Sequence, residues 1–306
     1  MMPMDKFPKV YVIVVTYKGR EWYDRCFLSF RKSTIPVEVV AVDNTPGDED
    51  ANYICTHFPE VHMIKPSINI GFGRANNIGM RYALDKGCDY VFLLNQDAWI
   101  KSDTLKILIE VALTNTEYGI LSPMHIRKDE KSLYIQIEDG SMDHGNTLLA
   151  DCYFQNLQDV YPFLYINAAA WLISRKVLET IGGFDPIFFL YGEDDNYLQR
   201  MHYHKQKVGL VPKSVIIHDH ITTSMEEKTE ILSYREKQIL LVKYTNINVP
   251  FHYVRNCLYL FRQIVLNMFH SCKKQKLRAE LVFLIKNETA IRNSREQNVL
   301  MAKNWL

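Results

Sequence analysis

Short apolar runs alternate with helix-like segments over the first hundred residues, and this alternation is the strongest constraint on the fold. The apolar runs are too short to be helices, whereas the segments between them have helical periodicity, as at 22–31 and 104–113. This pattern is typical of βαβ units, whose parallel strands are buried on both faces. The sequence therefore predicts an α/β fold with a mostly parallel central sheet and flanking helices, with strands at 10–15, 37–44, 61–66 and 90–94.

The pattern is less regular after residue 118. "GILSPMHI" and "SLYIQIED" predict strands, "EDDNYLQRMHYHK" predicts a helix and "KVGLVPKSVIIHDH" a further strand. Beyond Ser224 the segments are helix-like. We therefore expect one domain over residues 1–225 and a helical C-terminal extension over residues 226–306.

Cysteine usage and hydropathy bear on the compartment. The six cysteines include no CxxC pair, which argues against a disulfide framework or a zinc site. The first residues lack the apolar segment of a signal peptide, and no stretch of about 18 uncharged apolar residues occurs. A cytoplasmic protein is expected.

The formal net charge of +1 conceals a basic segment. Residues 237–279 contain eight Lys or Arg and no acid, so the remainder carries −7. A basic segment that also holds aromatic and aliphatic side chains suits an interfacial helix on an anionic membrane. The alternatives are a helix packed on the first domain or a homodimer contact. No nucleic-acid motif accompanies the charge, so a nucleic-acid partner is not expected.

Two predicted strands end in aspartate, Asp43 in "VAVDN" and Asp97 in "LLNQD". Ligands bind at the carboxyl ends of strands in open α/β sheets, and a buried carboxylate there needs a partner. The alternative is that each aspartate caps the following helix.

Two further clusters carry ionisable groups. Glu193, Asp194 and Asp195 stand where a helix is predicted to begin, a position that also favours plain capping. His218 and His220 alternate at the end of a predicted strand, so that both can face one side. Imidazole with carboxylate is a workable site for Mn²⁺ more than Mg²⁺, although structural histidines are the alternative.

"NIGFGRANNIG" begins like a dinucleotide fingerprint, but Asn76 stands where the third glycine belongs. We expect instead a glycine-rich loop that lets backbone amides approach a diphosphate.

Taken in order, these segments resemble a family-2 glycosyltransferase of the GT-A fold, in its rhamnosyltransferase-like subgroup. The resemblance covers about residues 8–222 and rests on "VIVVTYKG", "VVAVDNTPGD", "NIGFGRANNIGMRYAL", "YVFLLNQD", "WLISRKVLETIGGFDPIFFLYGEDDNYLQR" and "VIIHDH".

The resemblance implies roles for individual residues. Asp194 matches the catalytic base, with Glu193 in reserve, and Asp97 matches the last acid of the metal-binding DxD motif, with His218 or His220 as the late metal ligand for Mn²⁺ or Mg²⁺. Asn95 replaces the first DxD acid, and Asn196 replaces the last acid of "EDxD". Tyr191 and Trp171 are expected on the acceptor side. The expected nucleotide-sugar-binding residues are Thr16, Tyr17, Asp43, Asn69, Phe72, Asn76 and Asn95.

The implied function is inverting transfer of a sugar, from dTDP-rhamnose or a UDP-hexose, to a hydroxyl of a glycan or lipid-linked glycan in bacterial surface polysaccharide synthesis. The chemistry needs one carboxylate to take the acceptor's proton and a cation to stabilise the diphosphate. The alternatives are a nucleotidyltransferase and a non-catalytic nucleotide-sugar binding module.

Overall fold

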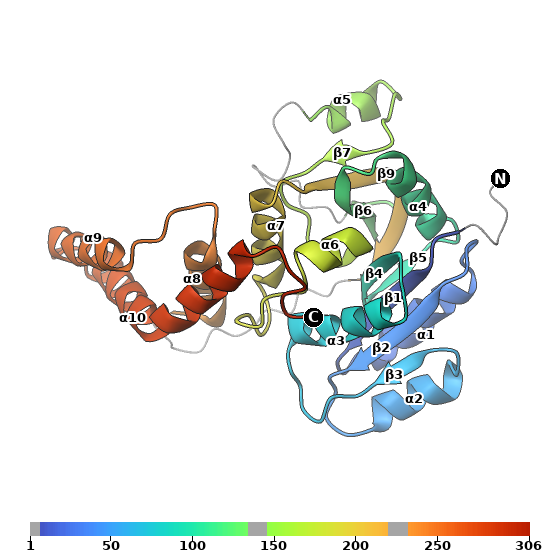
Figure 1. The fold of residues 1–306 in the computed structure, drawn as a ribbon, viewed down its shortest axis with the longest axis horizontal. Coiled ribbons are helices and arrows are strands. Elements are labelled where there is room, and N and C mark those ends of the chain that lie inside the picture. Colours follow the sequence, from blue (N-terminus) through green and yellow to red (C-terminus); the bar gives the residue numbers. More distant parts are fainter. Residues whose placement is uncertain (1–6, 134–145, 220–231) are drawn as a thin grey trace.

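The computed structural model describes residues 7–133, 146–219 and 232–306 (Figure 1). A nine-stranded sheet lies at the centre, with helices on both faces and a group of helices at the C-terminal side. The elements, in chain order, are β1 (Val10–Thr16), α1 (Arg20–Arg31), β2 (Glu38–Asp43), α2 (Glu49–His57), β3 (His62–Ile64), α3 (Phe72–Asp85), β4 (Tyr90–Asn95), β5 (Ala98–Ile100), α4 (Thr104–Thr114), β6 (Tyr118–Arg127), α5 (Leu148–Tyr153), β7 (Tyr161–Pro162), β8 (Ala170–Ser174), α6 (Arg175–Thr180), α7 (Glu193–Tyr203), β9 (Lys207–His218), α8 (Tyr234–Thr245), α9 (Tyr253–Leu266) and α10 (Ser271–Val299).

The strands follow the order β3-β2-β1-β4-β8-β6-β9-β5, and β7 pairs with β9. β1, β2, β3 and β4 are mutually parallel, and β6 and β9 run in the same direction as they do, whereas β5, β7 and β8 are antiparallel to these six. The predicted α/β fold with a mostly parallel sheet is confirmed. The carboxyl ends of β1, β2, β4 and β9 consequently lie at one edge of the sheet.

Each face of the sheet has its own apolar core, which explains why the strands are continuously hydrophobic. Along β1, Val10, Val12 and Val14 pack with α1, α2 and α4. The alternate side chains Tyr11, Ile13 and Val15 pack with α3, α6 and α7. A strand covered on both faces has no solvent side, so alternation of polar and apolar residues is lost.

Most predicted elements are present with small changes at their ends, but four were not predicted: the helix α2, the short strand β5, the helix α5 and the strand β7. The predicted strand "SLYIQIED" lies mostly outside the described residues.

The C-terminal helices α8 and α10 contact α7, and α9 packs on α10. The three helices share a third apolar cluster that includes Phe188, Leu241 and Leu284. Figure 1 shows α9 and α10 extending away from the sheet. The end of the chain returns to the sheet domain, where the Gly183 amide donates to the Asn304 carbonyl at 2.8 Å. A division at residue 225 stays a prediction. In the part of the chain that the structure describes, none of the helices combines the length and hydropathy needed to span a bilayer.

Candidate active site

Thr16 and Asp43 close the adjacent parallel strands β1 and β2 and stand directly opposite each other. The Thr16 hydroxyl donates to Asp43 Oδ1 at 3.0 Å, and the Thr45 amide donates to the same oxygen at 3.0 Å. Asp43 Oδ2 accepts from Lys65 Nζ at 2.8 Å. Both carboxylate oxygens of this buried residue are therefore bonded within the chain. Lys65, just beyond β3, was missed by sequence reasoning.

Asp97 and His218 form the second group at this edge. Asp97 lies in the turn between β4 and β5, and the pairing of Ala98 with His218 brings the end of β9 beside it. Asp97 Oδ1 and His218 Nε2 are 3.3 Å apart, and both side chains are mostly buried. Nearby, Asn95 ends β4, and its buried Oδ1 has no hydrogen-bond partner among the described residues. Each of these groups can offer an electron pair to a cation or a ligand.

The donor set at Asp97 and His218 fits a divalent cation. Two neighbouring ligands around an ion with bonds of about 2.1 Å stand about 3 Å apart, close to the observed separation. No group of three or more His, Cys, Asp or Glu that could hold a metal occurs within residues 7–133, 146–219 and 232–306. Two protein ligands are nevertheless sufficient where substrate phosphates and waters complete the shell.

A second histidine, His125, lies behind this pair and was also missed. Its ring centroid is 5.9 Å from that of His218, in an edge-to-face arrangement. Burial, followed by the nearby His218, lowers the pKa of His125 to about 3, so its ring is neutral at neutral pH. His125 Nε2 is 3.2 Å from the Ser122 hydroxyl. We infer that His125 supports the His218 ring rather than contributing charge.

The acid between the two predicted histidines is turned to other partners. Asp219 Oδ2 accepts from Lys128 Nζ at 2.6 Å and lies 3.7 Å from Arg25. Its backbone amide donates to the Asp97 carbonyl at 2.8 Å. His220 lies outside the described residues, so the choice between His218 and His220 as metal ligand stays a prediction.

Gln96 ties the β4–β5 turn to the loop after β1. Its amide oxygen accepts from the Tyr17 amide at 2.8 Å, and its amide nitrogen donates to the Tyr17 carbonyl at 3.0 Å. The Tyr17 ring remains exposed at the edge of the site. Gln96 thus joins the turn that carries Asp97 to the loop after β1.

The glycine-rich segment has a packing requirement of its own. Gly71 has φ +87°, and a Cβ there would lie 2.2 Å from the carbonyl oxygen of Phe189. The Phe72 amide donates to that carbonyl at 3.0 Å, and the Asn69 side chain accepts from the Gly71 amide at 2.9 Å. Asn76 is buried and donates within α3 to the Phe72 carbonyl at 3.1 Å. The segment therefore holds the loop before α7 close to α3.

Asp194 and Glu193 begin α7, which follows Gly192 in the left-handed conformation at φ 87°. Burial, followed by the Asp194 charge, raises the pKa of Glu193 to about 8, and its Oε2 has no hydrogen-bond partner in the described structure. Burial also raises the pKa of Asp194. Asn196, in place of the last acid, donates to Thr245 on α8 at 3.2 Å. Asp194 accepts a hydrogen bond from a neighbouring tyrosine.

That tyrosine is Tyr165, whose hydroxyl donates to Asp194 Oδ2 at 3.1 Å. The Ala168 amide hydrogen-bonds the same carboxylate, and both bonds favour its ionised form. One residue further on, the Ala169 carbonyl accepts from the Asn95 amide at 2.9 Å. The loop 165–169 therefore connects Asp194 to the strand end that leads to Asp97. Tyr165 was missed because its loop has no periodic pattern.

The two residues expected on the acceptor side lie in different surroundings. Tyr191 is exposed beside Gly192, and Arg235 lies over its ring at 5.2 Å. Trp171 is fully buried on β8, where it stacks against Phe184 with ring centroids 6.0 Å apart. Trp171 thus packs the core beneath the site.

Comparisons with known proteins identify the family of this chain. The model of the family described as "Glycosyl transferase family 2" matches residues 11–182, more than half of the chain. The chain belongs to glycosyl transferase family 2. This family-2 chain is 27% identical over 203 residues to the low-salt glycan biosynthesis hexosyltransferase Agl10 of Haloferax volcanii, a match that covers 65% of the chain and 63% of Agl10, less than two thirds of its length.

Two rhamnosyltransferases also match. The family-2 chain is 24% identical over 261 residues to the dTDP-rhamnosyl transferase RfbF of Shigella flexneri, covering 83% of the chain and 80% of RfbF. It is 24% identical over 230 residues to the N-acetylglucosaminyl-diphospho-decaprenol L-rhamnosyltransferase of Mycobacterium tuberculosis, covering 68% and 75%. The predicted rhamnosyltransferase-like resemblance is confirmed.

The fold is similar to that of a solved glycosyltransferase. A crystal structure of GalNAc-T7 with UDP, GalNAc and Mn²⁺ superposes with a TM-score of 0.64 at 14% identity, covering 98% of this chain and 56% of the other. At this identity the similarity concerns the fold alone, and it confirms the predicted GT-A architecture.

Proposed function

We propose that this family-2 chain is an inverting, metal-dependent glycosyltransferase in which Asp194 is the catalytic base. The observation that supports this most directly is the loop 165–169, which bonds to Asp194 at one end and to Asn95 at the other. The catalytic base and the diphosphate site must lie next to each other, because the acceptor hydroxyl attacks the anomeric carbon from which the diphosphate departs.

In the proposed step, Asp194 takes the proton of the acceptor hydroxyl as its oxygen forms a bond to the anomeric carbon. The bond from that carbon to the diphosphate oxygen breaks on the opposite side, and the configuration inverts. The raised pKa of Asp194 makes it a stronger base, while Tyr165 and the Ala168 amide hold one carboxylate orientation. Glu193, largely protonated at neutral pH, leaves Asp194 as the charged member of the pair.

Asp97 and His218 would hold the Mn²⁺ or Mg²⁺ ion, with the unpartnered Asn95 oxygen turned to the donor or its water shell. Such an ion, when bound, stabilises the negative charge of a diphosphate leaving group. Thr16, Tyr17 and Asp43 would bind the nucleoside. Asn69 in the loop before α3, with Phe72 and Asn76 on α3, would line the nucleotide pocket, and Tyr191 would lie on the acceptor side.

The donor is proposed to be dTDP-rhamnose or a UDP-hexose. RfbF is named for dTDP-rhamnosyl transfer, and the mycobacterial relative is named for an acceptor on a lipid diphosphate. We accordingly propose a glycan or lipid-linked glycan acceptor in surface polysaccharide synthesis. The enzyme would work in the cytoplasm, bound peripherally to the inner face of the plasma membrane through its basic C-terminal helices. The alternative role of these helices is homodimer formation.

Replacing Asp194 with Asn tests the proposal against a non-catalytic binding module or a nucleotidyltransferase. We expect Asp194→Asn to lower kcat by about 100- to 10,000-fold, because a general base of this kind contributes that much. Donor binding, measured by calorimetry with Mn²⁺, should stay unchanged, and a chelator should abolish it. Asp195→Asn in the same helical turn is the matched control and should retain turnover. Unchanged kcat in Asp194→Asn would contradict its role as the base.

A further inference from the structure

Helix α9 presents an unusual apolar stripe to solvent. Its members are spaced by four, three and four residues and therefore share one helical face. Only Leu260 of α9 is buried in the described structure. Phe269, in the turn to α10, is 92% exposed. The stripe, with exposed fractions between 53% and 67%, consists of Val254, Leu258, Phe261 and Val265.

Exposed cations lie on the helix that carries this stripe and on the helix that follows it. Arg255 and Arg262 stand on α9, and Lys273 and Arg278 stand on the first turns of α10. Residues 237–279 contain no acid, whereas the rest of the chain has a net charge of −7. The positive charge is therefore concentrated on the elements that expose the apolar stripe.

We propose that α9 and the α9–α10 turn dock on an anionic phospholipid bilayer. The stripe would enter the boundary between headgroups and acyl chains, with Phe269 beside it, and the two arginines would meet lipid phosphates. Apolar residues beside cations without acids match the chemistry of such a surface. The proposal specifies the peripheral membrane contact proposed above, but it does not depend on the catalytic step.

A second copy of the chain fits this surface less well. A two-fold contact places the same patch on both partners, so the cations of one copy would face those of the other. Residues 237–279 contain no acid that could separate them. Buried cores of protein interfaces are also depleted in charged residues.

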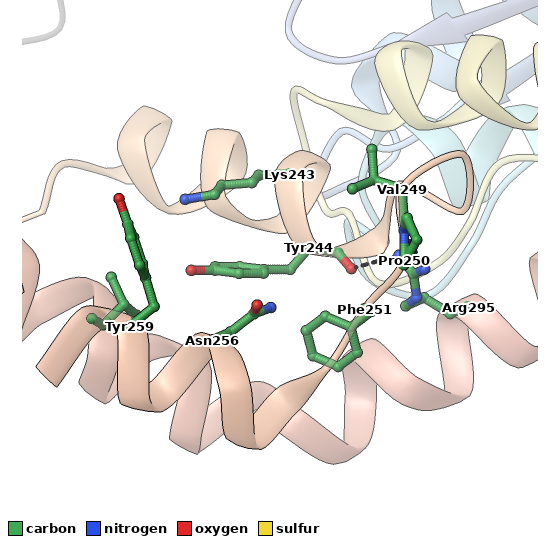
Figure 2. A pocket seen from close by; sticks show the side chains of 9 residues that line it. Lys243, Tyr244, Val249, Pro250, Phe251, Asn256, Tyr259 and Arg295 are labelled. Carbon is green, nitrogen blue, oxygen red and sulfur yellow. Dashed lines mark hydrogen bonds between the residues drawn. The ribbon is translucent and has the colours of Figure 1, made fainter. Parts of the chain in front are cut away.

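The segment that leads into α9 is anchored to α10. Arg295 of α10 donates to the carbonyls of Tyr244 and Val249, at 3.1 and 2.7 Å, and so fixes the connection from α8 to α9. Figure 2 shows Arg295 beside Val249 and Pro250. These three residues line a cavity of about 230 Å³. A bound bilayer would therefore stand in a defined position relative to α10.

Helix α10 in turn contacts the segment that leads to Asp194. The Ser294 hydroxyl and the Asn298 amide donate to Asp185 Oδ2 at 2.6 and 2.8 Å, nine residues before Asp194. If the proposed function holds, docking would orient the acceptor side of the site toward a lipid-linked acceptor.

Vesicle sedimentation of the full chain tests the proposal. We expect binding to vesicles of phosphatidylcholine with about 30% phosphatidylglycerol, and weak binding to phosphatidylcholine alone, because the cations need lipid charge. Raising the salt from about 0.1 to 1 M shortens the screening length from about 10 to 3 Å and should release most of the protein. Equal binding to both vesicle types would overturn the proposal.

Variants then locate the surface. The double variant Arg255→Gln/Arg262→Gln should lose about 10- to 30-fold in partitioning, since each cation near an anionic surface is worth about fivefold. Leu258→Asp should also weaken binding. Lys207→Gln/Lys213→Gln and Leu149→Asp are the matched controls, since Leu149 on α5 is 61% exposed, close to the 64% of Leu258. They should bind like the natural chain.

All of these variants should retain transfer to a soluble acceptor, so loss of docking is distinguishable from failure of the proposed function. Unchanged binding in the α9 variants would overturn the proposal. The proposal would also be overturned if light scattering showed a dimer that Leu258→Asp dissociates, and if the natural chain did not bind vesicles.

Discussion

Replacing Tyr165 with Phe should change how the rate depends on pH. The Tyr165 hydroxyl donates to Asp194 at 3.1 Å and favours the ionised carboxylate. A hydrogen bond to a charged group contributes about 1.5–3 kcal/mol, and about 1.4 kcal/mol is a tenfold change. Removing the bond raises the pKa of Asp194 further, so the base is protonated at higher pH. We expect kcat on the acidic side of the profile to fall about 10- to 100-fold.

The assay is kcat for nucleotide release measured from about pH 5 to 9, because kcat reports ionisation in the enzyme–substrate complex. At the alkaline end the variant should approach the natural enzyme, since Asp194 is ionised in both. The acidic limb belongs to the interacting Glu193–Asp194 pair rather than to one acid. Tyr161→Phe is the matched control, because Tyr161 donates to Asp151 at 2.8 Å, away from the site. A loss of equal size at every pH would refute the argument that Tyr165 acts through the ionisation of Asp194.

Two further predictions concern stability. Gly71→Ala should lower the free energy of unfolding, measured in urea, by roughly 3 kcal/mol or more. The new Cβ would lie 2.2 Å from the Phe189 carbonyl oxygen, and this overlap adds to the cost of a positive φ. Gly87→Ala, at φ +76° with no atom within 4 Å, should cost only about 1–2 kcal/mol, and equal losses would contradict this account. Glu193→Gln should stabilise the chain by roughly 2–4 kcal/mol at pH 8 and hardly at all near pH 4.5. The folded-state pKa of Glu193, about 8, exceeds its unfolded value, so the natural chain loses stability as pH rises through this window, and a pH-independent difference in Tm would contradict the prediction.

The strand ends were predictable because they depend on local pattern and chain order. Asp43 and Asp97 follow apolar runs of strand length, and parallel connections bring such ends to the same edge. His218 was predictable for the same reason, as the last residue of β9. These predictions needed only the period of the apolar residues.

Other residues could not be placed in this way. Lys65 and Tyr165 lie in irregular segments, 22 and 29 positions from the aspartates they contact, and nothing in their local sequence indicates those partners. Trp171 was expected beside the acceptor, yet its pairing with Leu93 on β4 turns it into the core. That pairing joins β8 to a strand almost eighty residues earlier, and the register between the two strands cannot be predicted from the sequence of either strand alone.

The sequence by itself determined the α/β fold, the polar strand ends and the basic character of residues 237–279, because periodicity, turn residues and charge are local properties. The tertiary structure decided which oxygens of Asp43 are already bonded, that His125 backs His218, and that α9 exposes its apolar stripe. These depend on distant segments meeting, since burial and hydrogen bonding arise from packing and not from the order of residues in one segment.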